Sequence, residues 1–173
     1  VLSVSLADGS TQTPLFSEMN KDARDFVRNR NDKLLGIIYG GLKPDTQFMD
    51  PKINSAFERL TNSFPRSRVR YISGEDSLEK IIVSISGEDS ALDFFLFNTS
   101  TLSLVRLKSA LPNIKNVAKR ELLTYESSDG IKIPAVFRLP VNTDLSAKMP
   151  LIVMPHRHGQ ISGVDWEREA DFF

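Results

Sequence analysis

The fold is decided by residues 69–107, which read VRYISGEDSLEKIIVSISGEDSALDFFLFNTSTLSLVRL. Four runs rich in β-branched and aromatic residues occur in this stretch, at residues 69–73, 80–86, 92–98 and 102–107. Three polar segments separate the runs: Gly74-Glu75-Asp76, Gly87-Glu88-Asp89 and Asn98-Thr99-Ser100. Because such segments favour tight turns, the spacing predicts four consecutive antiparallel strands. This meander has the size of one blade of a β-propeller.

Further strands are predicted upstream of the meander. Residues 1–6 alternate apolar and polar side chains, and residues 11–16 can pair with them across a turn at Asp8-Gly9. Residues 20–32 are crowded with charges, which fits a solvated loop or hairpin. That segment leads into an apolar strand at residues 34–39, which ends at two glycines.

A helix is predicted between these strands and the meander. Asp50 followed by Pro51 is typical of a helix N-cap and the first helical position. Apolar side chains then recur at helical spacing, at Ile53, Ala56, Phe57, Leu60 and Phe64. The pattern predicts an amphipathic helix over residues 51–63.

The sequence pattern changes after Lys108. Residues 111–113 have the character of a linker, and strand-like runs follow at 121–125 and 131–139, joined across residues 127–130. Residues 150–154 (PLIVM) are apolar at every position, which predicts a strand buried on both faces beneath helices. A second helix is expected to begin near Asp165. The expected fold class is therefore mainly β with one or two helices.

Composition excludes several partner classes. The 173 residues carry 22 Lys and Arg against 22 Asp and Glu, so the chain has no basic field for nucleic acid or an anionic membrane surface. Its apolar runs are much shorter than the roughly 20 residues of a spanning helix. The absence of cysteine excludes disulfides and thiolate metal sites, and we expect no cofactor.

The order of motifs after the meander resembles a known family. Residues 121–125 (ELLTY), 128–135 (SDGIKIPA), 137–140 (FRLP) and 150–156 (PLIVMPH) follow one another along the chain. This order is similar to the junction between propeller and hydrolase domain in the dipeptidyl and acylaminoacyl peptidase branch of the prolyl oligopeptidases. Residues 35–39 (LGIIY), with the segment up to residue 70, also resemble the last propeller blades of that branch.

The resemblance implies a domain plan and an activity. Residues 1–110 would be the C-terminal part of a β-propeller, and residues 118–173 the opening strands and first helix of an α/β-hydrolase domain. The parent protein would be a serine-type peptidase that hydrolyses peptide bonds in oligopeptides by acyl transfer to serine. In the family the catalytic Ser, Asp and His lie downstream of these motifs, so we expect the chain itself to be inactive.

The same resemblance marks a loop as the candidate site. His156, Arg157, His158 and Gly159 occupy the place of the family's oxyanion loop, where two glycines follow the histidine. Glycines there let a backbone N–H approach the oxyanion, so Arg157 and His158 put that donor geometry in doubt. A histidine that fixes a loop through backbone hydrogen bonds is the favoured interpretation of His156.

Other functional interpretations of this C-terminal region are weaker. His156 and His158 supply two imidazoles, with a third ligand sought at Asp165, Glu167 or Glu169, but two ligands do not make a metal site. Ser162 stands one position too late to match a G-x-S-x-G elbow.

Three features of the meander have both a functional and a structural interpretation. The acidic pairs Glu75/Asp76 and Glu88/Asp89 fit solvated turns better than acid–base catalysis. The alternating Arg66, Arg68 and Arg70 could attract a substrate carboxylate, although an exposed strand face is the favoured interpretation. Residues 94–97 (FFLF) are expected in the core rather than at a ligand.

Two alternative functions stay open. The chain could act as a non-catalytic β-module that binds a peptide or protein through exposed sheet edges. The parent could instead be an esterase of the α/β-hydrolase class, because a fold alone does not choose the substrate. As an isolated fragment, the chain is expected to self-associate or to be disordered beyond about Lys108, because its apolar strand lacks cover.

Overall fold

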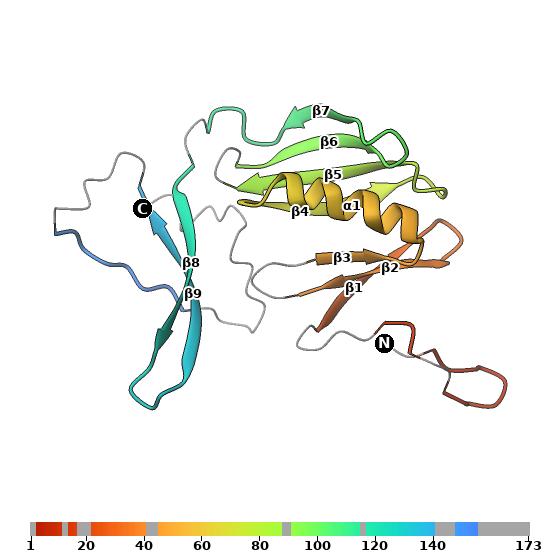
Figure 1. The fold of residues 1–173 in the computed structure, drawn as a ribbon, viewed down its shortest axis with the longest axis horizontal. Helices are drawn as coiled ribbons and strands as arrows, with labels where there is room; N and C mark the ends of the chain where they lie inside the picture. Colours follow the sequence, from red (N-terminus) through yellow and green to blue (C-terminus); the bar gives the residue numbers. More distant parts are fainter. Residues whose placement is uncertain are drawn as a thin grey trace.

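The chain is mainly β in a computed structural model, which describes residues 3–11, 14–16, 22–40, 45–87, 91–114, 117–140 and 148–155. These residues form nine strands in three antiparallel sheets and one α-helix (Figure 1). The mainly β fold class is therefore confirmed. No helix among the described residues is long and apolar enough to cross a membrane.

The predicted meander forms a four-stranded sheet. Its strands β4 to β7 pair in sequence order, each antiparallel to the next, and span Ser67–Gly74, Lys80–Gly87, Asp93–Asn98 and Leu104–Ser109. All four predicted runs are confirmed, with ends that differ by up to two residues. The start of β7 moves from residue 102 to Leu104 because Leu102 has a positive φ of 59°, a turn conformation rather than an extended one.

A three-stranded sheet precedes the helix, in the order β1 (Ala23–Arg28), β2 (Leu34–Tyr39) and β3 (Asp45–Phe48). The apolar strand β2 is confirmed with the predicted bounds. Of the two structures predicted for the charged segment before it, the hairpin is correct, because β1 pairs with β2. Strand β3 was not predicted, since its sequence DTQF contains a single large apolar residue.

Helix α1 (Pro51–Ser63) forms over the predicted residues. The Asp50 carboxylate accepts hydrogen bonds from the backbone N–H groups of Lys52, at 2.8 Å, and Ile53, at 3.3 Å. These two groups have no acceptor within the helix, so the carboxylate supplies one. The predicted N-cap and proline at the first turn are therefore confirmed.

Replacing this cap should weaken the fold measurably. We expect Asp50→Ala to lower the free energy of unfolding by about 1 kcal/mol, within a range of roughly 0.5–2 kcal/mol, because two N–H groups lose their acceptor. Urea denaturation followed by circular dichroism measures the loss. Asp50→Asn is the matched control, since an asparagine caps about as well. Equal losses in both variants would contradict the capping role.

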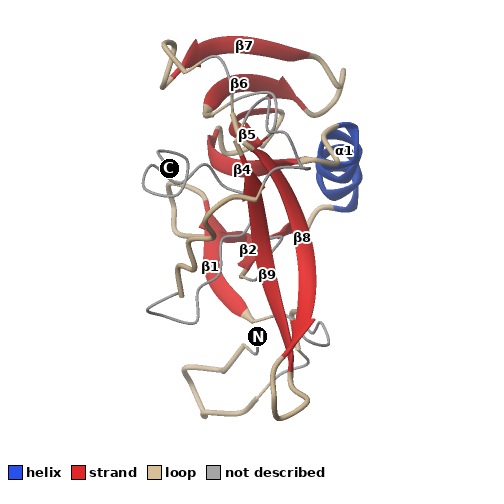
Figure 2. Ribbon diagram, turned by 90° about the vertical axis from the view of Figure 1, so that its left-hand side faces the viewer, coloured by secondary structure: helices blue, strands red, loops and turns tan. Residues whose placement is uncertain are grey.

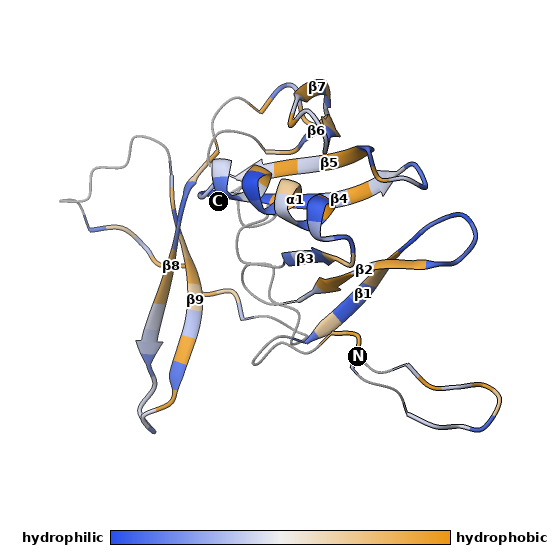
Figure 3. Cartoon of the chain, turned by 45° about the vertical axis from the view of Figure 1, so that its right-hand side comes forward, coloured by the Kyte–Doolittle hydropathy of each residue, from blue (hydrophilic) through white to orange (hydrophobic). Residues whose placement is uncertain are grey.

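One hydrophobic core joins the two larger sheets and the helix. It contains Val27 of β1, Phe48 of β3, Phe57 of α1, Val83 of β5 and Phe97 of β6, all almost fully buried. The helix lies against one side of the sheets (Figure 2), and β2 and β5 are rich in apolar residues (Figure 3). The expectation that residues 94–97 contribute to the core is met by Phe97, and by Phe95, which packs against this cluster.

The third sheet is a hairpin of β8 (Lys119–Glu126) and β9 (Lys132–Leu139). Both strands were predicted, as was their connection across residues 127–130, where Gly130 has a φ of 82°. No side chain of the hairpin belongs to either buried apolar cluster of the described residues. Within the described residues, β8 and β9 are held together by their antiparallel pairing.

Two predicted elements are not seen among the residues that the structure describes. Residues 150–154, expected as a strand buried on both faces, have no regular structure, and Leu151 and Val153 are 73% and 75% exposed. An apolar strand needs neighbours to bury it, and the described residues pair none with this segment. Of the predicted N-terminal hairpin, residues 3–11 and 14–16 show a single bridge, between Val4 and Thr11. The helix expected near Asp165 lies outside the described residues.

Candidate functional site

The predicted oxyanion loop, with His156, Arg157, His158 and Gly159, lies outside the described residues. The same holds for Ser162 and for Asp165, Glu167 and Glu169, the acidic residues considered as metal ligands. Their roles therefore stay predictions.

The first acidic pair has the turn role that the sequence favours. Glu75 accepts hydrogen bonds from the Ser77 hydroxyl, at 3.0 Å, and from the Lys80 backbone N–H, at 2.9 Å. Asp76 accepts from the backbone N–H of Arg30, in the β1–β2 turn, at 3.3 Å. Both carboxylates therefore stabilise the β4–β5 turn and its contact with the neighbouring sheet. The second pair, Glu88 and Asp89, lies outside the described residues.

The interpretation of Arg66, Arg68 and Arg70 as one exposed strand face is wrong for the middle residue. Arg66 and Arg70 are exposed, but Arg68 is only 3% exposed. The cause lies outside its own strand: residues of β1, β2 and β3 lie opposite β4 and enclose a cleft with it. Strand alternation predicted that Arg68 and Arg70 share a direction, but it did not predict the neighbouring sheet that buries Arg68.

This arginine cleft is a polar site between β4 and the first sheet. It has a volume of about 120 Å³, and its charged lining residues are Arg24, Asp25, Asp45, Arg68 and Arg70. The register of β1 against β2 shifts between Ala23 and Asp25, so Arg24 sits at a β-bulge. Bulges often redirect a side chain away from the regular alternation, and this one falls at the cleft.

The cleft is lined by more positive than negative side chains, three arginines against two aspartates. The pKa of Arg68 is lowered to about 10, mainly by burial and then by the positive charges of Arg70 and Arg24. Each acidic residue is held by the next backbone amide: Asp25 accepts from the Phe26 N–H and Asp45 from the Thr46 N–H, both at 2.8 Å. The positive charges of Arg24 and Arg70 therefore disfavour the charged form of the buried Arg68.

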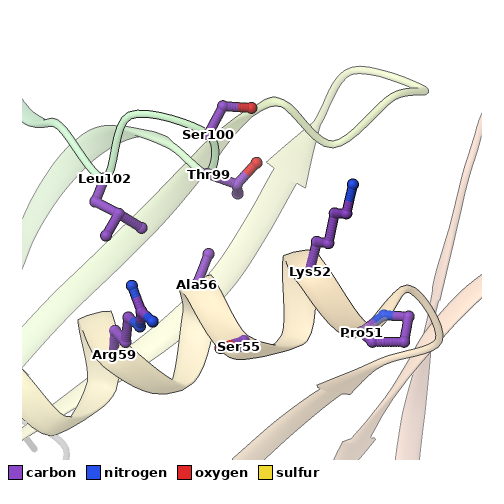
Figure 4. A pocket seen from close by; sticks show the side chains of 8 residues that line it. All are labelled: Pro51, Lys52, Ser55, Ala56, Arg59, Thr99, Ser100 and Leu102. Atoms are coloured by element: carbon purple, nitrogen blue, oxygen red, sulfur yellow. The ribbon is translucent and has the colours of Figure 1, made fainter.

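A larger and more open groove of about 350 Å³ lies between α1 and the turn that joins β6 to β7. Figure 4 shows Lys52, Ala56 and Arg59 directed from the helix towards Thr99 and Leu102. The Thr99 hydroxyl donates to the backbone oxygen of Leu78 at 3.0 Å, so it has a structural role. The eight described lining residues include no imidazole or carboxylate.

Sequence reasoning missed the residues that complete the arginine cleft. Arg24 and Asp45 stand more than 20 residues away from Arg68 in the chain, and no local motif joins them. The alternation of arginines in β4 was a usable signal, and it identified two of the three cations.

Comparisons of this chain with protein-family models, with curated proteins and with solved structures gave no match.

Proposed function

We propose that this chain is part of a serine-type peptidase of the prolyl oligopeptidase family, and that it spans the end of a β-propeller and the start of an α/β-hydrolase domain. The observation that carries the proposal is the β4–β7 sheet, four antiparallel strands in sequence order. Propellers are built from blades of this kind. In this proposal β1, β2 and β3 belong to the preceding blade.

The β8–β9 hairpin supports the second half of the proposal. It follows the meander after a short connection, and it shares no buried cluster with the first two sheets among the described residues. Its turn carries Ser128-Asp129-Gly130, and β9 ends at Leu139, next to Pro140. These are the motifs that resemble the entry into the hydrolase domain. The parent would cleave peptide bonds with a serine nucleophile, which requires a base and an oxyanion site.

The decisive experiment determines the rest of the coding sequence and assays the full-length protein. Sequencing the gene beyond the codon for Phe173 should show a further strand followed by G-x-S-x-G, and the full product should react with a fluorophosphonate probe. Replacing the elbow serine with alanine should abolish that labelling. The 173-residue chain should not be labelled above a denatured control, because no activated serine is expected in it.

Each alternative function predicts a different result. A stop codon directly after Phe173 would contradict the peptidase proposal and favour a β-module that binds peptide or protein. An elbow with cleavage of acyl esters but not of peptide bonds would favour an esterase parent. Cleavage of oligopeptides by the full protein would support the proposal as stated.

A further inference from the structure

The open groove between α1 and the β6–β7 turn carries positive charge without negative charge. Its eight described lining residues include two cations, Lys52 and Arg59, and no carboxylate. Both side chains are exposed, and Figure 4 shows them directed from the helix towards the turn. The other lining residues are uncharged: Pro51, Ser55, Ala56, Thr99, Ser100 and Leu102. A surface of this kind favours a negatively charged ligand.

Neither cation is neutralised within the described part of the chain. The side-chain nitrogens of Lys52 and Arg59 have no hydrogen-bond or ion-pair partner among the described residues. The acidic residues beside them in the sequence have other partners: Asp50 accepts from the backbone N–H of Lys52, and Glu58 accepts from the side-chain amide of Asn54, both at 2.8 Å. Because Lys52 lies in the first turn of α1, the helix dipole adds to the positive potential at this end of the groove.

Leu102 is independent evidence that the groove is a contact surface. Three described residues other than glycine have a positive φ: Asp32, Leu78 and Leu102. An aspartate tolerates this conformation, and Leu78 is 4% exposed, so packing can hold it there. Leu102, with a φ of 59°, is 41% exposed and lines the groove. The turn therefore presents an apolar side chain that a partner could cover with a gain in stability.

We propose that this groove binds an acidic polypeptide segment, with one carboxylate at Lys52, a second at Arg59, and an apolar side chain between them against Ala56 and Leu102. Lys52 and Arg59 are seven positions apart in the sequence, which is about 10 Å along a helix axis. Side chains on one side of an extended peptide recur about every 7 Å. Alternate residues of such a peptide can therefore reach both cations, whose long side chains adjust to the remaining difference.

Size and charge favour a polypeptide over other anions. The volume of about 350 Å³ exceeds the roughly 300 Å³ at which ligand pockets begin, so the groove can hold several side chains. Nucleic acid needs a row of cations along its phosphates, whereas this groove has two and the whole chain has no net charge. The proposal depends neither on the peptidase activity proposed above nor on the arginine cleft.

Fluorescence anisotropy on the whole chain tests the proposal with a labelled peptide, acetyl-Glu-Ser-Leu-Ser-Glu. We expect saturable binding that weakens as salt is added. Lys52→Gln and Arg59→Gln, both at exposed positions, should each weaken binding about fivefold, the value of one exposed ion pair. A peptide with glutamine in place of both glutamates should bind about 25-fold more weakly, since it loses both pairs. Arg30→Gln, an exposed control in the β1–β2 turn, should leave affinity unchanged.

Leu102→Asn separates the apolar contact from the charges. Asparagine tolerates a positive φ, so the fold should keep its stability while binding weakens about fivefold and retains its salt dependence. Equal affinity for the glutamate and glutamine peptides, an equal loss in Arg30→Gln, or binding without saturation would overturn the proposal. Tighter binding of a thymidine pentanucleotide than of the acidic peptide would also overturn it, in favour of a nucleic-acid ligand.

Discussion

Phe57→Ala is expected to lower the free energy of unfolding by about 3–5 kcal/mol, the usual cost of truncating a fully buried phenylalanine. Phe57 is 1% exposed and belongs to the core cluster that joins α1 to both larger sheets. Its ring packs edge to face against Phe48 of β3, with centroids 5.2 Å apart. Since stable domains of this size have only about 5–15 kcal/mol in total, this one change should leave the fold marginal.

The contact with Phe48 makes the effect spread beyond the helix. Phe48 also packs edge to face against Tyr71 of β4, with centroids 5.7 Å apart, so one aromatic chain runs from α1 through β3 to β4. Removing the Phe57 ring leaves a cavity next to that chain and removes a pair interaction worth about 0.5–1.5 kcal/mol. The near-ultraviolet circular dichroism of the aromatic residues should therefore weaken together with stability.

Urea denaturation of matched variants measures the effect. Phe26→Ala is the control, because Phe26 is a phenylalanine of β1 that is 38% exposed. Its loss should cost about 1 kcal/mol or less, as surface substitutions generally do. A Phe57→Ala loss no larger than the Phe26→Ala loss would show that the helix does not close the core. An unchanged slope of the free energy against urea would show that the variants unfold from equally compact states.

Elements whose signals are local were predictable from sequence. Residues 51–63 form the predicted helix because an acidic cap, a proline and helical apolar spacing all occur within that segment. Strand β2 and the four strands of the meander likewise follow from apolar runs bounded by turn residues.

Elements that depend on a partner were not predictable. Strand β3 has little apolar character, and it forms because its backbone pairs with β2. Residues 150–154 have the composition of a buried strand but lie exposed, since composition signals the need for burial and does not provide the neighbours. The burial of Arg68 in the candidate site was not predictable for the same reason. Alternation within β4 indicates which way its side chain points, but the residues of β1, β2 and β3 that bury it are distant in the sequence.

The second large effect is expected at Gly36, a glycine of β2 where that strand pairs with β3. We expect Gly36→Ala to lower the free energy of unfolding by about 1–3 kcal/mol, the usual cost of overpacking a closely packed site. Gly36 lies opposite Phe48 in the β2–β3 pair. A Cβ atom on Gly36 would fall 2.6 Å from the backbone oxygen of Gln47 and 3.2 Å from the Cα of Phe48.

The cost is steric rather than conformational. Gly36 is not among the described residues with a positive φ, so alanine can adopt its backbone angles. The atoms in the way are backbone atoms of β3, which cannot rotate aside as a side chain could. Strand β3 must therefore move away from β2, and Phe48 moves with it, which disturbs the aromatic contacts with Phe57 and Tyr71.

Gly40→Ala separates this effect from the general consequence of adding a methyl group. Gly40 directly follows the same strand, also lacks a positive φ, and its added Cβ would meet no atom closer than 3.8 Å. Alanine there should leave stability unchanged or raise it by up to about 1 kcal/mol, because it restricts the unfolded chain. Thermal and urea unfolding of both variants test the contrast. Equal stabilities would mean that β2 and β3 are not as close at Gly36 as their register requires, and would also remove the support for Phe48 as the link between the two sheets.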